Sequence, residues 1–443
     1  MDLRQKLLNG DLKIGVWGTG FIGYSSMAYF ANKGVKCIGY DINKEIVDKI
    51  NKGEIPVPGL GYWLAFDVKP LVDSKMMRST IDHRELIKPD VSVHLIAIPT
   101  EKEDKPWDGA LIDVISKLTA FKNIKTQEPP LIIIESTLTP GRSDQIIIPL
   151  LEKAGLKVGK DILLGVAPRR DWFISSDKSL KTLPRIIGGT TPETTEKMRQ
   201  VLGLVVDTLH SAPDHKHAEM VKSIENAYRH VGISLANQLS LAYPEINMRE
   251  VLRLVGTKWN IPTYQPSFGT GGYCIPLSSQ YVLLGTNNKQ ILNLLQNTID
   301  VDCRMPGIVA DSVIKRGAKK VGILGLSYKG NLKVHILSPT LKLAKHLKEK
   351  GVDVKINDPQ YTPEEIKKIT GLESFDFPQG MNEFDTLLLV ADHREYIYTQ
   401  IKDILANLKN CKLILDNTSI WSHIDFKQKG IEYHVAGDRN WLK

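Results

Sequence analysis

The sequence predicts an α/β protein with two Rossmann-like domains, each built on a doubly wound parallel sheet, joined by a long central helix. Three observations carry this prediction. Short β-branched runs alternate with helix-like stretches over roughly the first 200 residues. A stretch from His215 to Tyr243 then has no proline and one glycine, which predicts one long helix ending at Pro244. After Pro306 a second α/β alternation begins.

The expected strands are short apolar segments, most of which end in Gly, Asp, Pro, Ser or Thr. Ligands of such folds bind beyond the carboxyl ends of the strands, so these ends mark candidate sites. Between the two sheets, "INMREVLRLVGT" predicts a shorter helix, a Gly- and Pro-rich loop follows, and helical sequence resumes near "SQYVLLGT". The strands expected are "LKIGVWG", "KCIGYD", "VSVHLIAIP", "PLIIIEST", "DILLGVAP" and "PRIIGG" in the first sheet, then "KKVGILGLSYKG", "VDVKIND", "FDTLLLVAD" and "CKLILDN" in the second.

The composition fits a globular protein of two or three domains, since 443 residues exceed one ordinary core. No apolar run is long enough to span a bilayer, and the N-terminus has no apolar signal segment, so we expect a cytoplasmic protein without membrane insertion. The net charge of +8 is spread along the chain, which favours small anionic ligands over nucleic acid.

The strongest local motif is "GTGFIG", which follows a predicted strand and matches G-x-G-x-x-G. Gly18 allows a tight turn, Gly20 lets the backbone approach a pyrophosphate, and Gly23 lets helix and strand pack closely. Asp41 ends the next strand and would accept hydrogen bonds from a ribose, which favours NAD over NADP. A purely structural turn is the alternative. The expected cofactor contacts from this motif are Gly18, Gly20, Phe21, Ile22 and Gly23.

A second glycine turn, at Gly322 and Gly325, lacks the third glycine and a matching acid. We therefore expect it to bind a nucleotide without the second half of a dinucleotide, or to serve packing alone.

The long helix carries Lys222 and Asn226 four residues apart, so both project from one face and could meet one ligand oxygen. An ammonium and a carboxamide so placed stabilise an alkoxide or oxyanion. Cys274 lies in the glycine-rich loop "FGTGGYCIP", where Gly271 and Gly272 permit a ligand to come close. Each of these residues alone would more often be structural. The four cysteines are scattered and the histidines show no paired-ligand spacing, so we expect no metal.

Taken in order, the motifs resemble the UDP-glucose/GDP-mannose dehydrogenase family over nearly the whole chain. They are "GTGFIG", Asp41, "IPT", "ESTLTPG", "LPRIIGG", "AEMVKSIENAYRHVGISLANQ", "GTGGYCIP", "VGILGLSYKGN" and "NDP". The resemblance implies an NAD-binding domain at residues 1–212, a central helical dimerisation region with the cysteine loop at 213–305, and a nucleotide-sugar-binding domain at 306–443. It also implies a homodimer or higher homo-oligomer, and two-fold NAD-dependent oxidation of a sugar 6-hydroxymethyl group to a carboxylate for polysaccharide precursors.

The same resemblance assigns roles to individual residues. Cys274 would be the nucleophile that forms a thiohemiacetal and then a thioester, while Lys222 and Asn226 hold the reacting oxygen. Thr137 would lie beside the nicotinamide and the reacting centre. The other contacts implied are Thr100 for the cofactor, and Gly271, Gly272, Lys329 and Arg169 for the substrate. The loop "TKWNIPTYQPSFGTGGYC" looks more like the branch acting on UDP-N-acetylhexosamines than like the UDP-glucose branch.

Four positions depart from the family pattern. Ser278 stands where the family has an aspartate that positions or activates water. Arg169 replaces a glutamate near the active site, so it either binds a different anionic group of the substrate or is offset by Asp171 close by. Gln238 replaces a glutamate after the long helix's active face. The stretch "KVHILS", Lys333 to Ser338, loses two acids and an arginine expected to meet NAD. Two alternatives therefore stay open: an oxidoreductase that stops at the aldehyde or uses another nucleotide-linked substrate, and a catalytically impaired nucleotide-sugar-binding protein.

Overall fold

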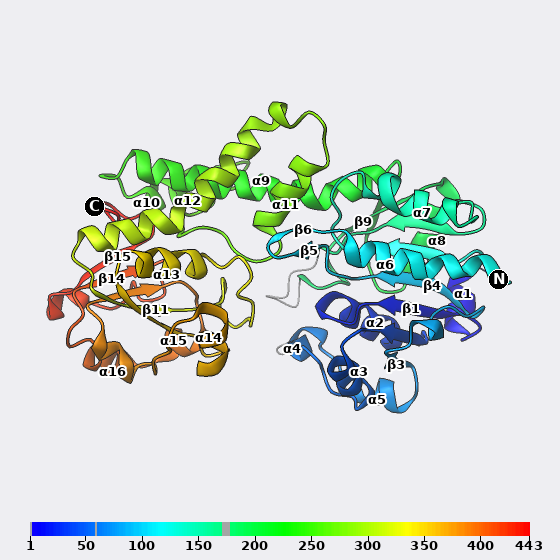
Figure 1. Cartoon of the computed structure of the whole chain (residues 1–443), viewed down its shortest axis with the longest axis horizontal. Helices are drawn as coiled ribbons and strands as arrows, with labels where there is room; N and C mark the ends of the chain where they lie inside the picture. Colours follow the sequence, from blue (N-terminus) through cyan, green and yellow to red (C-terminus); the bar gives the residue numbers. More distant parts are fainter. Residues whose placement is uncertain (1, 58–59, 171–177) are drawn as a thin grey trace. The chain divides into compact units, whose positions relative to one another are not determined.

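The computed structural model describes residues 2–57, 60–170 and 178–443. The chain folds as two compact units, the first formed by Met1–Glu225 with Gln280–Asn287 and the second by Asn226–Ser279 with Asn288–Lys443. Each unit is built on its own sheet with helices on both faces (Figure 1). The two Rossmann-like sheets expected from the alternating pattern are confirmed.

The first unit has an eight-stranded sheet in the order β10-β9-β8-β7-β4-β1-β2-β3. Its neighbouring strands are parallel except for β8 and β9, which run antiparallel through Gly165–Gly189 and Val166–Gly188. The strands are β1 Lys13–Trp17, β2 Cys37–Tyr40, β3 Met77–Thr80, β4 Val91–Ile96, β7 Leu131–Ile134, β8 Leu163–Val166, β9 Arg185–Gly189 and β10 Leu209–Ser211, with a separate pair β5 Glu101–Lys102 and β6 Lys105–Pro106.

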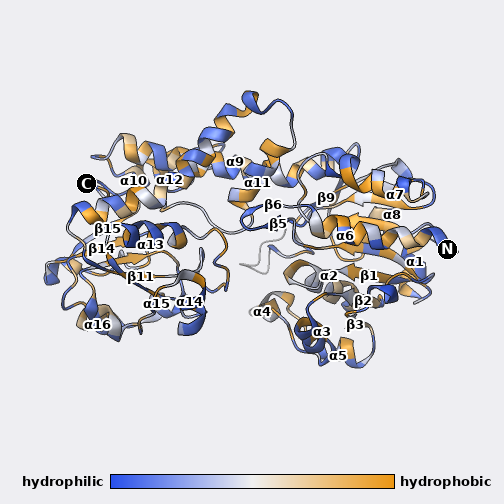
Figure 2. Cartoon of the chain, in the orientation of Figure 1, coloured by the Kyte–Doolittle hydropathy of each residue, from blue (hydrophilic) through white to orange (hydrophobic). Residues whose placement is uncertain are grey.

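Alternate residues of the central strands enter two separate apolar cores, which explains why both faces are covered. On β1, Ile14 and Val16 join the core beneath α2, while Trp17 joins the core on the opposite face. The helices of this unit are α1 Leu3–Leu8, α2 Phe21–Asn32, α3 Lys44–Asn51, α4 Leu60–Leu64, α5 Lys69–Asp73, α6 Gly109–Leu118, α7 Ile148–Lys153 and α8 Pro192–Leu202. Hydrophobic and hydrophilic residues both occur along outer helices such as α6 (Figure 2), as expected for helices that bury one face.

The second unit has a fully parallel five-stranded sheet in the order β12-β11-β13-β14-β15. Its strands are β11 Lys320–Leu324, β12 Asp353–Asn357, β13 Thr386–Leu389, β14 Leu413–Asp416 and β15 Glu432–Val435. Its helices are α10 Met248–Val255, α12 Asn293–Lys315, α13 Pro339–Glu349, α14 Pro363–Thr370, α15 Arg394–Tyr398 and α16 Ile401–Ala406. Two cores again lie on opposite faces, since Val321 and Ile323 of β11 enter one and Leu324 enters the other.

Two helices belong partly to each unit. The long helix expected from the proline-free run is confirmed as α9, His215–Ala242, with Lys222 in the first unit and Asn226 in the second. The helix α11, Ile275–Leu284, begins directly after Cys274, earlier than the sequence pattern suggested. Pro276 explains the difference, because proline is well tolerated in the first turn of a helix. The expected domain limit at 305–306 falls inside α12. None of the helices in the described ranges combines the length and apolar character that a bilayer crossing needs.

Candidate active site

The glycine-rich turn after β1 has the geometry that its three glycines suggest. Gly18 has φ +82°, and a Cβ there would lie 2.5 Å from the carbonyl oxygen of Ala97. A Cβ on Gly23 would overlap the carbonyl oxygen of Gly18. Gly20 differs, because a Cβ there would meet no atom within 4 Å. Gly18 and Gly23 are thus required by the protein itself, whereas Gly20 leaves open space at the start of α2.

The N-terminus of α2 has no side-chain cap, since its N-cap is Gly20. The first N–H groups of the helix are therefore available to an anion, and the helix dipole favours negative charge at this end. The residues present fit a dinucleotide pyrophosphate at this turn.

Asp41, directly after β2, is already held by the protein. Its Oδ2 accepts hydrogen bonds from the backbone N–H of Thr19 at 2.8 Å and from the Thr19 hydroxyl at 3.2 Å, and its Oδ1 accepts from Asn43 N–H at 2.9 Å. A carboxylate has about four acceptor positions, so one remains on Oδ1 for a ribose hydroxyl. Asp41 thus fixes the glycine-rich turn and keeps capacity for the ligand.

Thr100 and Thr137, expected near the cofactor, lie in the loops that follow β4 and β7. The Thr100 hydroxyl donates to the Thr137 carbonyl at 2.8 Å. Tyr281 of α11 joins them, with its hydroxyl 3.0 Å from Thr100 Oγ1 and donating to the Thr100 carbonyl at 3.0 Å. No sequence motif marks Tyr281, because its partner Thr100 lies 181 residues away.

Arg169 is buried within the first unit and has partners there. Its guanidinium donates to the hydroxyls of Ser25 and Ser26 on α2 and lies 4.0 Å from Glu135 Oε2. Glu135 also accepts from Arg185 at 2.6 Å and from the Ser26 hydroxyl at 2.6 Å. Glu135 is thus shared between Arg185 and Arg169, and the substrate contact expected of Arg169 stays a prediction. Asp171, the offset considered from the sequence, lies outside the described residues.

The first half of α9 holds the loop after β7 and carries Lys222. Glu219 accepts hydrogen bonds from the N–H groups of Arg142 and Ser143 and from the Ser143 hydroxyl. Burial raises the pKa of Glu219, although these donors act in the opposite direction. Lys222 lies one turn later on the helix and makes no hydrogen bond or ion pair within the part of the chain that is described. Its ammonium is thus available to a ligand.

Asn226 contacts the position where the family pattern has an acid. Its Nδ2 donates to Ser278 Oγ at 3.0 Å, and both side chains are buried in the second unit. This pairing joins α9 to α11 just beyond Cys274. Asn226 therefore keeps one N–H and its Oδ1 for another partner.

Cys274 is exposed and is followed at once by the first turn of α11. Gly272 has φ +78°, its N–H donates to the Ile336 carbonyl at 2.8 Å, and a Cβ there would lie 2.6 Å from the Tyr328 ring. Burial, and then the charge of a Cys274 thiolate, raise the pKa of Tyr328 to about 12. Gly271 and Gly272 thus let the loop pack on the Tyr328 side chain while the thiol stays open to solvent.

Lys329 lies in the loop after β11, next to Tyr328. Burial lowers its pKa, with Asp392 raising it and Arg229 lowering it further. Among the other departures from the family pattern, Lys333 forms an ion pair with Glu365 at 2.6 Å, and Gln238 is exposed on α9.

The second glycine turn does have a matching acid, which the sequence reading missed. Asp358 follows β12, and its Oδ2 accepts from the N–H groups of Leu326 and Ser327 at 2.8 Å each. Its Oδ1 accepts from Gln360 N–H, and His393 Nε2 lies 3.2 Å from Oδ2. Three of these contacts fall on Oδ2 and one on Oδ1, and the side chain is buried, so Asp358 orders the loop.

The fold and these residues define an NAD-dependent dehydrogenase with a second nucleotide-binding unit. The chain belongs to the UDP-glucose/GDP-mannose dehydrogenase family. The NAD binding domain of that family matches residues 12–204, its central domain residues 216–302 and its UDP binding domain residues 322–423. The chain is accordingly an NAD-dependent nucleotide-sugar dehydrogenase.

Similar proteins cover nearly the whole chain. Protein CapL of Staphylococcus aureus is 29% identical, over 91% of this chain and 95% of its own. UDP-N-acetyl-D-mannosamine dehydrogenase of Methanococcus aeolicus is 26% identical, over 99% of this chain and 98% of its own. The solved structure of the UDP-D-ManNAc dehydrogenase from Pyrococcus horikoshii has a TM-score of 0.82 at 26% identity, covering 97% of this chain and 100% of that one.

Proposed function

We propose that this enzyme oxidises the 6-hydroxymethyl group of a UDP-N-acetylhexosamine to the carboxylate, using two NAD, as a step toward a polysaccharide precursor. UDP-N-acetylmannosamine is the first candidate, because similar proteins carry that substrate in their names. The observation that carries the proposal is an exposed Cys274 at the start of α11, with Asn226 bonded to the same helix one turn later.

In this proposal NAD, when bound, accepts a hydride in each of the two oxidation steps. Unit 1 offers the open turn at Gly20 and the remaining acceptor position of Asp41 for the dinucleotide. A carboxylate at Asp41 disfavours a 2′-phosphate, which selects NAD over NADP. Thr100 and Thr137 lie at the carboxyl ends of β4 and β7, where the nicotinamide half is expected.

Lys222 and Asn226, one turn apart on α9, hold the sugar oxygen as it becomes a carbonyl. The Cys274 sulfur then adds to the aldehyde carbon, losing its proton and forming a C–S bond. Loss of the second hydride leaves a thioester on Cys274. Water adds to the thioester carbon, the C–S bond breaks, and the carboxylate product leaves with the thiol restored.

The second unit supplies the substrate contacts in this proposal. Lys329 meets the negatively charged diphosphate, and Gly271 and Gly272 allow the substrate to approach the Cys274 loop. Arg169 is left out, because its guanidinium is buried and bonds the serines of α2 within the first unit. The competing proposal is an enzyme that releases the aldehyde. The observation that favours it is Ser278, which is not a base and stands where the family has a carboxylate.

We also propose that the enzyme is a homodimer formed by the central helices. The second unit exposes large apolar side chains on α9, on α10 and just after α10: Tyr228 at 77%, Leu235 at 53%, Leu254 at 53% and Trp259 at 92%. Tyr228 and Leu235 are seven residues apart and share one face of α9. Such a face fits burial against a second copy. Light scattering of the purified protein tests this, and the double change Leu235→Glu, Leu254→Glu should give monomers.

The cytoplasmic location stays a prediction.

The substrate is tested by incubating the purified enzyme with NAD and, separately, UDP-N-acetylmannosamine, UDP-N-acetylglucosamine, UDP-N-acetylgalactosamine, UDP-glucose and GDP-mannose. The proposal expects the highest kcat/KM with an N-acetylhexosamine. Comparable or faster NADH formation with UDP-glucose or GDP-mannose would refute the substrate class. The variant Lys222→Met is the matched control for background NADH, because it keeps the length of the side chain and removes the charge.

A further inference from the structure

Two hydrogen bonds, one helical turn apart, join α9 to α11 beyond Cys274. Asn226 bonds Ser278, and His230 Nδ1 lies 2.8 Å from Ser279 Oγ. His230 is four residues after Asn226, so the two side chains share one face of α9. The family resemblance assigns a ligand-binding role to Asn226 and no role to His230.

His230 also faces a buried carboxylate on a third helix. Its Nε2 lies 3.4 Å from Asp302 Oδ2 on α12, and the side chains are 1% and 7% exposed. Asp302 in turn accepts hydrogen bonds from Thr270 N–H at 2.8 Å and from the Thr270 hydroxyl at 2.6 Å. A buried carboxylate needs nearby donors or a cation. Thr270 provides two donors, whereas His230 Nε2 lies close to Asp302 without forming a hydrogen bond in the described structure.

The contacts of His230 therefore lie on both sides of the nucleophile. Thr270 precedes Cys274 by four residues, and Ser279 follows it by five. One imidazole thus hydrogen-bonds Ser279 after the thiol and lies against Asp302, which holds Thr270 before it. Gly269, directly before Thr270, has φ +120°, and Gly272 within the segment has φ +78°, so the segment takes backbone conformations that favour glycine.

The order Ser279, His230, Asp302 is also that of a hydrolase triad, but this chemistry does not fit here. Ser279 is fully buried between helices, so its hydroxyl has no access to a substrate carbonyl. A role in positioning is what the contacts support.

We propose that His230 is a positioning residue, which with Asp302 and Ser279 holds Cys274 at its reacting position. The proposal rests on the proposed function of Cys274. It predicts that His230 acts on the reactivity of the thiol and on kcat, and leaves the KM for NAD unchanged, because the glycine-rich turn makes none of these contacts.

Two conservative variants separate the two contacts. In His230→Gln the amide nitrogen occupies the place of Nε2 and keeps a polar N–H group facing Asp302. In His230→Asn the amide occupies the place of Nδ1 and retains only the partner Ser279. Because Asp302 anchors the loop through two hydrogen bonds, we expect His230→Gln to stay close to wild type. We expect kcat of His230→Asn to fall about 10- to 100-fold, the usual effect of misplacing a reacting group.

Thr270→Val tests the far end of the same chain of contacts. It keeps the shape of the side chain and removes the hydroxyl that donates to Asp302, while His230 stays intact. The proposal expects kcat to fall in the same direction as for His230→Asn, with the KM for NAD unchanged. This variant also keeps the proposal testable if His230 variants do not fold.

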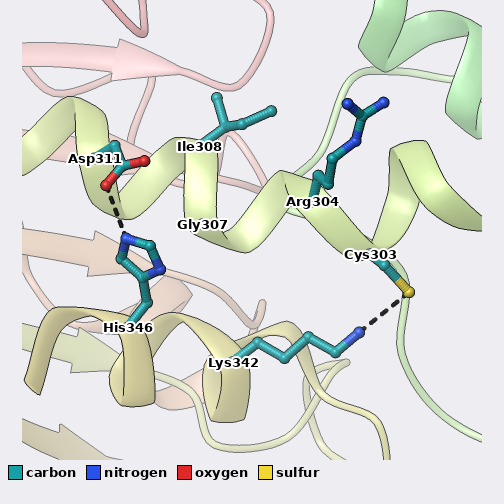
Figure 3. A pocket seen from close by; sticks show the side chains of 7 residues that line it. All are labelled: Cys303, Arg304, Gly307, Ile308, Asp311, Lys342 and His346. Carbon is teal, nitrogen blue, oxygen red and sulfur yellow. Dashed lines mark hydrogen bonds and ion pairs between the residues drawn. The ribbon is translucent and has the colours of Figure 1, made fainter. Parts of the chain in front are cut away.

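The chain offers a matched control in a second His–Asp pair of the same unit. His346 of α13 contacts Asp311 of α12 at 2.7 Å, beside a cavity of about 370 Å³ whose lining also includes Cys303 and Lys342 (Figure 3). His346→Gln should leave kcat and thiol reactivity at the wild-type level, because this pair is exposed and has no contact with residues 270–279 among the interactions described.

The closing experiment measures the rate of Cys274 alkylation by iodoacetamide, without substrate, in a Cys303→Ser background. This background removes the other exposed thiol, since Cys37 and Cys411 are buried. We expect the alkylation rate to change in His230→Asn and Thr270→Val and to match wild type in His230→Gln and His346→Gln. Equal behaviour of the Asn and Gln variants, or lost turnover with an unchanged alkylation rate in folded protein, would overturn the proposal. Because alkylation needs no sugar, failure of the proposed substrate would leave this result interpretable.

Discussion

Asn226 Nδ2 donates a hydrogen bond to Ser278 Oγ over 3.0 Å, and the two residues are 2% and 1% exposed. A hydroxyl group therefore occupies the position, four residues after the nucleophile, where the family pattern has a carboxylate. The hydroxyl can accept this bond as a carboxylate would, so Asn226 is held in place. It cannot take a proton from water near neutral pH, so this position supplies no general base.

Thioester hydrolysis should consequently be the slow step. A general base contributes about 10²- to 10⁴-fold, so its absence delays the final step more than either hydride transfer. Rapid mixing of enzyme, NAD and substrate should give a burst of two NADH per Cys274, one for each hydride transfer that precedes hydrolysis, followed by slower turnover. Ser278→Asp should shorten or remove the burst, whereas Ser278→Ala, which adds no base, should keep it. A time course without a burst would show that another group activates the water.

Cys274→Ala should abolish formation of the acid, because no thioester can form. The matched control is Cys303→Ser, which changes the other exposed cysteine and should leave turnover intact. Analysis of the sugar product by mass spectrometry distinguishes the uronate from the alcohol and the aldehyde. Uronate formed by Cys274→Ala at the wild-type rate would exclude Cys274 as the nucleophile.

Gly20→Ala should weaken NAD binding, whereas Gly23→Ala should lower the stability of the protein. A Cβ on Gly20 meets no protein atom, so the variant should fold, but the methyl group enters the space open to the pyrophosphate. Losing one charge-assisted hydrogen bond raises the KM for NAD about tenfold or more. A Cβ on Gly23 overlaps the carbonyl of Gly18, so that variant should lose about 1–3 kcal/mol or more of stability. Thermal melting and NAD titration separate the two, and unchanged NAD affinity of Gly20→Ala would contradict the cofactor site.

Substrate binding should weaken as the pH rises through the lowered pKa of Lys329. The protonated ammonium binds the diphosphate below this pKa, and burial lowers the pKa from its usual value of 10.5, so the loss begins at a lower pH than for an ordinary lysine. Lys329→Arg stays charged and should flatten the dependence of KM for the UDP-sugar on pH. The KM for NAD measured over the same range is the internal control. If the KM for the UDP-sugar depended on pH in the same way in the wild type and in Lys329→Arg, Lys329 would not be a ligand of the diphosphate.

The features that were predictable from sequence are those whose causes are local. The turn from Gly18 to Gly23 and the length of α9 follow from residues within the element itself, and both are present. The sequence pattern places the start of α11 too late, because Pro276 is as typical of a loop as of the first turn of a helix. The acid Asp358 was overlooked because its role depends on a turn 31 residues earlier in the chain.

Side-chain partners that are distant in sequence could not be predicted. Among the described residues, Arg169 contacts Glu135 and the serines of α2, up to 144 residues away in the sequence. The partner of Asn226 is 52 residues away, and that of His230 is 49 residues away. The resemblance marked Ser278 as unusual, but only the packing of α9 on α11 shows that its hydroxyl bonds Asn226.

The ratio of NADH formed to sugar consumed, measured with UDP-N-acetylmannosamine, tests the central claim most directly. If Cys274 carries the substrate through a thioester that water hydrolyses, two NADH form for each uronate, even though Ser278 makes the last step slow. A ratio of one, with the aldehyde as the product, would contradict this mechanism and would assign to the chain an oxidation that ends before the thioester.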